Sequence, residues 1–126
     1  MKYYSISEAA AKFNIPESTI RYYDKKGLLP LVERNEAGRR LFSEDQIALL
    51  ATVMCLKNTH MPISGIQKYI DWVVEGESTI EIRLEMMKNH KAAVLDEISL
   101  MTESLKGIDE KIIRYTKRIQ ERKENK

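Results

Sequence analysis

The last third of this chain carries an apolar repeat that is too long for one compact domain to bury. From Ser78 onward only Gly107, and no proline, interrupts the chain for more than 40 residues, which predicts one long helix. Eleven positions in it step alternately by three and four residues, and ten of them are apolar or aromatic. This seam consists of Leu84, Met87, Lys91, Val94, Ile98, Met101, Leu105, Ile108, Ile112, Tyr115 and Ile119.

The seam requires a partner. A helix of this length spans about 60 Å at ~1.5 Å per residue, so its apolar face has to be buried on another helix. A second copy of the chain is the simplest candidate, which predicts a homodimer. Lys91 is the one mismatch in the seam, and it either marks the register or extends its ammonium group to water.

Length and composition exclude several classes of protein. The 126 residues allow one compact domain with an extension, and 43% hydrophobic residues argue against disorder. The chain has no long uncharged apolar run and no signal peptide, so we expect a cytoplasmic protein without membrane contact. Cys55 is the only cysteine, and His60 and His90 are widely separated, so we expect no metal and no cofactor.

Two short helices are expected near the N-terminus. Ser5 and Glu8 have the spacing of a capping box, which begins a helix whose apolar stripe ends at Phe13. Pro16 and Gly27 suit the beginning and the end of a second helix near 16–26. Two helices joined by so short a connection form a helix-turn-helix, the second helix of which is suited to a DNA major groove.

The next segment predicts a wing. Between Leu29 and Phe42 the helical period disappears, and two extended runs surround the turn-forming residues 35–38. Arg39 and Arg40 lie on the return side of this hairpin, where guanidinium groups either contact a DNA backbone or protect a sheet edge.

Two further helices complete the compact part. Ser43 and Gln46 repeat the capping-box spacing and open a third helix that ends near Asn58. The apolar stripe expected for it is Ile47, Leu50, Ala51, Met54 and Cys55. A fourth helix begins at Pro62 and stops at Gly76, with its stripe at Ile66, Tyr69, Ile70 and Val73.

Charge is unevenly distributed although its total is only +2. Residues 1–42 carry 8 basic and 5 acidic groups, while residues 43–105 carry 5 and 10. A basic N-terminal third is compatible with a polyanionic partner. In the second helix Ile20 and Tyr23 are expected to face inward, and the outward or edge positions are Glu17, Ser18, Arg21, Tyr22 and Lys25.

Residues 4–10 (YSISEAA), 19–30 (TIRYYDKKGLLP) and 38–42 (GRRLF) resemble the N-terminal region of the MerR family of bacterial transcription regulators. The resemblance covers roughly residues 3–75, and the long helix is similar in kind to the family's antiparallel dimerisation helix. It implies a homodimer on double-stranded promoter DNA, with an inverted-repeat operator in a long spacer. It also implies that the activated dimer bends and untwists this DNA, and so acts on RNA polymerase indirectly through the shared promoter.

The resemblance also assigns DNA contacts. It places them at Thr19, Arg21, Tyr22 and Tyr23 in the recognition helix, Arg40 in the wing and Lys57 in the third helix. Ser18 and Arg39 share the same predicted surface, although Arg39 departs from an aromatic residue common at its position.

Cys55 has two interpretations. Its place is similar to that of the lone cysteine in the aldehyde- and electrophile-responsive branch, where a modified thiolate acts as a stress-response switch. It also lies on the expected apolar stripe, where it would be an inert core residue. Soft-metal sensing is disfavoured because no cysteine follows residue 55, and multidrug binding because the chain stops just beyond the long helix.

Tyr69 and Trp72, three residues apart, either line a small effector pocket or belong to the core. The sequence thus predicts a mainly helical protein with three parts. These are a winged helix-turn-helix domain at 1–76, a coiled-coil dimerisation helix at 77–122 and a charged tail at 123–126. We expect a transcriptional regulator associated with the bacterial nucleoid and not an enzyme, the alternative being a coiled-coil scaffold whose N-terminal module binds protein.

Overall fold

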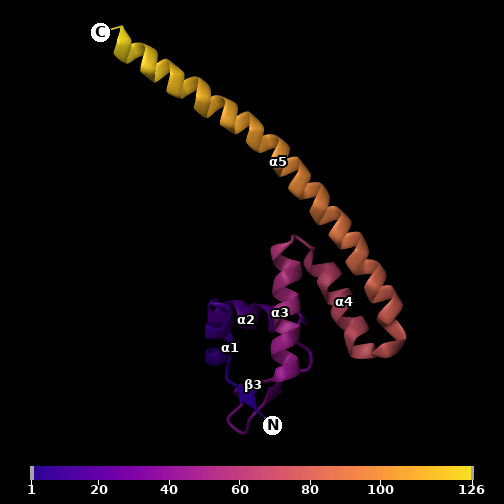
Figure 1. Ribbon diagram of the computed structural model, residues 1–126. Coiled ribbons are helices and arrows are strands. Elements are labelled where there is room, and N and C mark those ends of the chain that lie inside the picture. The colour runs from indigo at the N-terminus through magenta and orange to yellow at the C-terminus, as the bar shows by residue number, and fades with distance from the viewer. Residues whose placement is uncertain (1, 126) are drawn as a thin grey trace. The chain divides into compact units, whose positions relative to one another are not determined.

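The computed structural model describes residues 2–125, and they form a small three-stranded sheet with surrounding helices and one long helix (Figure 1). The elements in chain order are β1 (Tyr3–Tyr4), α1 (Ile6–Phe13), α2 (Glu17–Lys25), β2 (Glu33–Arg34), β3 (Arg40–Ser43), α3 (Glu44–Asn58), α4 (Ile63–Glu75), the 3₁₀ turn η1 (Glu77–Thr79) and α5 (Ile80–Glu124). The chain divides into two compact units, one ending at Leu84 and the other beginning at Glu85.

The helix-turn-helix forms where the sequence predicts it. Ser5 accepts a hydrogen bond from the Glu8 backbone N–H, and the Glu8 carboxylate accepts one from the Ser5 N–H, so the capping box is complete. Asn14, at φ 53°, ends α1 in the left-handed conformation that asparagine tolerates better than most residues. Gly27, at φ 75°, follows α2 as expected.

The predicted wing is a hairpin of β2 and β3. Glu33 pairs with Leu41 and Arg34 with Arg40 in antiparallel register. The Asn35 side-chain oxygen accepts hydrogen bonds from the Ala37 and Arg39 backbone N–H groups, both at 3.0 Å, which holds the turn closed. The sequence did not predict β1, whose two residues pair with the other edge of β3.

The hydrophobic core lies within the first unit and is shared by its helices and the sheet. Its largest fully buried side chains are Phe42, Ile20, Leu28, Leu29, Leu50, Ile66, Ile70 and Val53. Each contributes on the order of 1.5–3 kcal/mol by leaving water, so α2, β3, α3 and α4 are held as one body. Gln67 on α4 also connects this helix to the end of α2, because its amide donates a 2.6 Å hydrogen bond to the carbonyl oxygen of Lys26, the residue after α2.

The predicted buried face of α3 is partly wrong. Ile47 and Leu50 are buried as expected, but Ala51 and Cys55 are exposed. The residues actually buried are Gln46, Ile47, Leu50, Val53 and Leu56. Apolar residues occur on every side of this helix, so the periodicity did not determine which side packs inward.

The long helix begins two residues later than its predicted start at Ser78. Gly76 turns the chain at φ 104°, and Thr79 is buried with its hydroxyl 2.6 Å from the Trp72 carbonyl oxygen and 2.7 Å from that of Gly76. These bonds close η1, and α5 then continues without a break to Glu124. The predicted tail at 123–126 is therefore helical through Glu124, and Lys126 lies outside the described residues.

No residue of α5 is buried within the described chain. Most seam residues are exposed, with Met101 at 69% and Ile108 at 57%, while Met87 and Val94 are half-buried. Large apolar side chains in such numbers are costly to leave in water, and an exposed apolar surface of this kind is typical of an interaction site.

Candidate nucleic-acid interface

The two faces of α2 separate core from surface as the sequence predicts. Ile20 and Tyr23 are buried and fix the helix against the core. Ser18, Arg21 and Tyr22 are exposed, and Thr19 is half-buried at the boundary between the two faces. The exposed face is polar and cationic, which suits contacts with phosphates and base edges.

Arg21 is held above this face by an ion pair. Its Nη2 atom lies 3.1 Å from Glu17 Oε1, and the other Glu17 oxygen accepts a 3.0 Å hydrogen bond from Ser7 Oγ. Both ionic side chains are well exposed, so the pair contributes little to stability and costs little to exchange. Arg21 is thus positioned yet available for an incoming phosphate or guanine.

The two adjacent tyrosines have different roles. Their ring centroids are 6.1 Å apart, with an interplanar angle of 56°. Tyr22 is 43% exposed, and Lys26 Nζ lies 5.7 Å from its ring centroid. Tyr23 is only 6% exposed, and its burial, together with the neighbouring Tyr22, raises its pKa. Of the two, the structure exposes Tyr22 and packs Tyr23 in the core.

Arg40 forms an ion pair with Asp24, which the sequence did not predict. Its Nε atom donates a 2.7 Å hydrogen bond to Asp24 Oδ2, and Arg34 Nη2 lies 3.7 Å from the same oxygen. Asp24 therefore connects α2 to both strands of the wing. The only signal in the sequence is that Asp24 is an acidic residue among basic neighbours in α2.

The three arginines predicted to lie at the DNA surface line the same hollow. Arg21, Arg39 and Arg40 line a hollow of about 400 Å³ between the helix-turn-helix and the wing. Its other lining residues are Ser5, Ile6, Ser7, Glu17 and Gly38. The first turn of α1 therefore belongs to this surface, which the sequence analysis had not included. Lys57 is exposed in the last turn of α3 and is not among the residues of this hollow.

Cys55 lies on the exposed side of α3, outside the buried stripe. Its interpretation as a core residue is therefore wrong for the single chain. Lys57, two residues further along, is also exposed.

Tyr69 lines a hollow that Trp72 does not line. Tyr69 lines a hollow of about 270 Å³ between α3 and α4, together with Leu31, Asp45, Ala48, Leu49, Thr52, Val73 and Arg83. Trp72 is half-buried and is not among those lining residues, and Lys68 Nζ lies 5.6 Å from its ring centroid.

Within residues 2–125 no three histidine, cysteine or acidic side chains are grouped so that they could hold a metal ion. In the same range, none of the helices has the length and apolar character needed to cross a bilayer.

Comparison with known proteins identifies the fold. The model of the MerR HTH family of regulatory proteins matches residues 4–71. An uncharacterised HTH-type transcriptional regulator of Haemophilus influenzae is 36% identical over 90% of this chain and 84% of its own length.

Solved structures agree with this assignment. A MerR family transcriptional regulator from Bacillus thuringiensis superposes with a TM-score of 0.85 at 46% identity, over 90% of this chain and 99% of that one. HiNmlR, described as a MerR family regulator lacking the sensor domain and bound to promoter DNA, superposes with a TM-score of 0.85 at 35% identity. That match covers 92% of each chain.

Proposed function

Because this chain belongs to the MerR family of helix-turn-helix transcriptional regulators, we propose that it binds promoter DNA as a homodimer and activates transcription by distorting the spacer. The observation that carries the proposal is the convergence of Arg21, Arg39 and Arg40 on one exposed surface. HiNmlR, at 35% identity, is described as bound to promoter DNA, which supports the same use of the surface here.

In this proposal the surface residues have separate tasks. Arg21 and Tyr22 contact bases or phosphates in the major groove, with Ser18 and Thr19 at the margin of the contact. Arg39 contacts phosphate or the minor groove from the wing, and Lys57 contacts the backbone from α3.

Arg40 and Tyr23 act differently from the other predicted contacts. Arg40 uses Nε on Asp24, so it holds the wing against α2, and the same residue lines the hollow. Tyr23 supports the recognition helix from within the core. Both residues therefore shape the DNA-binding surface.

Two such surfaces in a homodimer contact two half-sites of an inverted repeat. When the activated dimer bends and untwists the DNA between them, RNA polymerase reaches both promoter elements, so the regulator needs no direct contact with the polymerase. We assign DNA binding to residues 1–76 and dimerisation to 77–122, and place the protein in the bacterial cytoplasm, at the nucleoid.

Cys55 is the proposed sensor. Its thiol is exposed on α3, close in sequence to the Lys57 phosphate contact. Addition of the thiolate to a small aldehyde forms a C–S bond, and the carbonyl oxygen takes a proton to give a hemithioacetal, with no oxidation or reduction. The added bulk on the helix that also carries Lys57 supplies a local change that a two-state dimer can amplify.

Two experiments test the proposal. Binding to the promoter beside the protein's own gene should weaken steeply with salt, since phosphate contacts release counterions. If binding does not depend on salt or on DNA sequence, the alternative of a coiled-coil scaffold is favoured. In vitro transcription from that promoter, with and without an aldehyde, then compares the unaltered protein with Cys55→Ser. If both proteins bind DNA and neither responds, the sensor assignment fails and DNA regulation stands.

A further inference from the structure

The hollow between the helix-turn-helix and the wing has one acidic residue in its lining, Glu17 at the beginning of α2. We propose that Glu17 and Ser7 set the DNA-sequence specificity of this protein, because together they keep Arg21 from binding phosphates and leave it to bind a base edge. The inference rests on the proposed function for DNA binding itself. It adds two positioning residues, and it explains why a surface that binds a polyanion contains a carboxylate.

The polar groups of this hollow come from three separate parts of the fold. Ser7 belongs to α1, Glu17 and Arg21 belong to α2, and Arg39 and Arg40 belong to the wing. Side chains from three directions can converge on one bound group, so the arrangement has the character of a recognition site.

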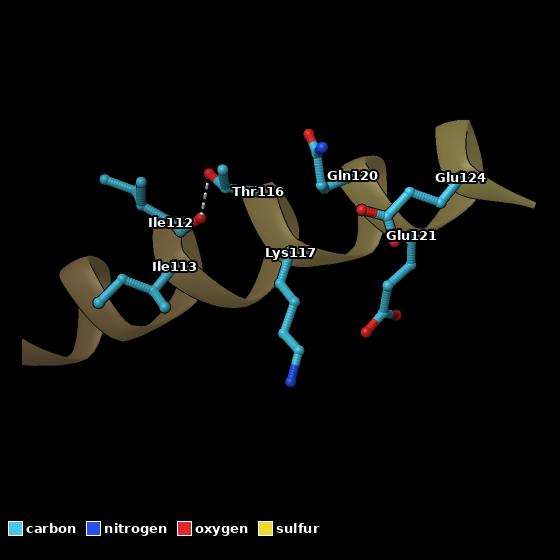
Figure 2. Close-up of a pocket in the computed structure, with 7 residues that line it drawn as sticks. All are labelled: Ile112, Ile113, Thr116, Lys117, Gln120, Glu121 and Glu124. Atoms are coloured by element: carbon cyan, nitrogen blue, oxygen red, sulfur yellow. Dashed lines mark hydrogen bonds between the residues drawn. The ribbon is translucent and has the colours of Figure 1, made fainter.

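A second hollow, near the C-terminal end of α5, shows the contrast. It has a volume of about 560 Å³, and all of its lining residues belong to that one helix (Figure 2). Ile112 and Thr116 lie on one side of the helix and Ile113 and Lys117 on the other, so these side chains do not converge. That hollow is an open helix face, and we assign no ligand to it.

The Glu17 carboxylate is held at both of its oxygens. Oε2 accepts a 3.0 Å hydrogen bond from Ser7 Oγ, and Oε1 accepts a 3.1 Å hydrogen bond from Arg21 Nη2. Ser7 lies ten residues before Glu17, on the other helix of the helix-turn-helix. The first helix therefore orients the arginine of the recognition helix, and Glu17 transmits this orientation.

Arg21 can still bind a base while Glu17 holds it. A guanidinium has five N–H donors, and Glu17 accepts a hydrogen bond from Nη2 only. The Arg21 side chain is 53% exposed. A bidentate contact to O6 and N7 of a guanine therefore remains available.

Binding to a phosphate is a different matter, because phosphate and carboxylate repel each other. Every DNA sequence presents phosphates, and an arginine that binds one of them gains affinity without gaining sequence information. Glu17 offsets the charge of Arg21 and opposes a phosphate beside it, whereas a guanine edge is an uncharged acceptor. Glu17 thus weakens binding to any DNA, and weakens it least where a guanine faces Arg21, which raises specificity.

The exposure of Glu17 suits this use better than a structural one. The Glu17 side chain is 38% exposed, and an ion pair so accessible to water adds little to folding stability. Asp24 on the same helix is only 24% exposed and bonds to Arg40 at 2.7 Å. Asp24 is therefore suited to connecting two elements, and Glu17 to competing with an incoming anion.

Glu17→Gln in the full-length chain tests the proposal. Fluorescence anisotropy compares the promoter fragment with a scrambled fragment of the same length and base composition. We expect affinity for the scrambled fragment to rise about three- to fivefold, and affinity for the promoter to change by less than about twofold. The slope of log affinity against log salt should become steeper by about one on the scrambled fragment alone, because Arg21 then neutralises a phosphate there.

Glu103→Gln is the matched control for Glu17→Gln. It removes the same charge and breaks an exposed 3.1 Å ion pair with Lys106 on α5, outside the residues assigned to DNA binding. Both affinities should stay unchanged. Glu17 also lies in the first turn of α2, where an acidic residue stabilises a helix. If this were its only role, Glu17→Gln would lower the thermal midpoint and leave the ratio of the two affinities unchanged, which would overturn the proposal.

Ser7→Ala separates orientation from charge. The variant keeps the Glu17 carboxylate but lacks the hydroxyl that holds it, so the ratio of promoter to scrambled affinity should fall about two- to threefold. The salt slopes should not change, because the number of charges is the same. Ser7→Ala combined with Glu17→Gln should match Glu17→Gln alone. Ser99→Ala on α5 is the control, and a ratio equal to that of the unaltered protein in Ser7→Ala would remove Ser7 from the proposal.

The Arg21→Ala background tests whether Glu17 acts through Arg21. Without the guanidinium, Glu17→Gln should no longer change the ratio of the two affinities, because only general repulsion remains. An equal fall in the ratio in both backgrounds would overturn a positioning role.

The same titrations distinguish this inference from the proposed function. If the unaltered protein binds both fragments equally, sequence-selective DNA binding is contradicted, and the inference fails with it. If the unaltered protein prefers the promoter and Glu17→Gln keeps the full preference and the same salt slopes, the proposed function stands and the inference alone is overturned.

Discussion

Asp24 on the recognition helix and Arg40 on the wing are joined by a 2.7 Å hydrogen bond between charged groups. The two residues are sixteen positions apart in the chain, and the bond fixes the wing relative to α2. Both side chains are less than a quarter exposed, so water screens the bond less than it screens the Arg21–Glu17 pair.

Asp24→Asn should therefore lower both stability and DNA affinity. We expect a loss of about 1–2 kcal/mol in the free energy of unfolding, because a charge-assisted bond is lost and Arg40 keeps no counter-charge there. Urea unfolding and fluorescence anisotropy with a promoter fragment measure the two effects. Glu17→Gln, which removes an exposed pair, is the control for stability. Equal stability for Asp24→Asn and the unaltered protein would contradict a positioning role.

Arg21→Ala should weaken promoter binding without affecting the fold. The expected cost is about 1–3 kcal/mol if the guanidinium binds a base, accompanied by relaxed sequence preference. If it binds phosphate, the slope of log affinity against log salt falls by about one. Arg114→Ala on α5 is the matched control. Unchanged affinity for Arg21→Ala would remove this residue from the interface.

Tyr23 should make stability fall at alkaline pH. Burial raises the pKa of its phenol in the folded protein, so the neutral form is favoured there. This contribution is complete below the unfolded pKa of about 10 and is lost as the pH rises through the higher folded value. Thermal unfolding between pH 9 and 11 should thus decline less steeply for Tyr23→Phe. Tyr22→Phe removes only the smaller of the two causes of the raised Tyr23 pKa, so its slope should lie closer to that of the unaltered protein. Identical slopes for both variants would argue against the buried phenol.

The contribution of Glu8 to folding stability should be lost at acid pH. The backbone N–H of Ser5, and then the Ser5 side chain, hold the pKa of its carboxyl below the ordinary 4.5. The stabilisation is present above the unfolded pKa and is lost as the pH falls through the lower folded value. Glu8→Gln keeps an acceptor but lacks the charge, so its thermal midpoint should lie below that of the unaltered protein at pH 7. The two should converge at pH 3, and a constant difference would contradict this account. Glu36→Gln, at the wing tip, controls for the general loss of one charge.

Much of the fold was predictable because its signals are local. The Ser5–Glu8 capping box, the glycine after α2 and the steps of three and four residues in the seam are each set by near neighbours in the sequence, and each predicted the correct element. The face of α3 was not predictable in this way. Cys55 and Val53 are both compatible with an apolar stripe, and only packing against β3 and α4 determines which of them is buried.

The interface was predictable as a set of exposed side chains and not as a geometry. The exposure of Arg21 and Tyr22 could be predicted, because a helix that buries Ile20 turns these two side chains toward the solvent. The bond from Asp24 to Arg40 depends on how the wing folds back, and a two-residue strand such as β1 is too short to leave a periodic signal.

The exposed seam has a consequence for gene dosage. If the DNA-binding species is a pair of chains, its abundance at low expression rises with the square of the number of chains. A twofold change in synthesis then gives about a fourfold change in occupied operators in that range. A chain without a partner would display the apolar side chains of α5 to proteases and chaperones, and removal of such copies would make the response to expression steeper still.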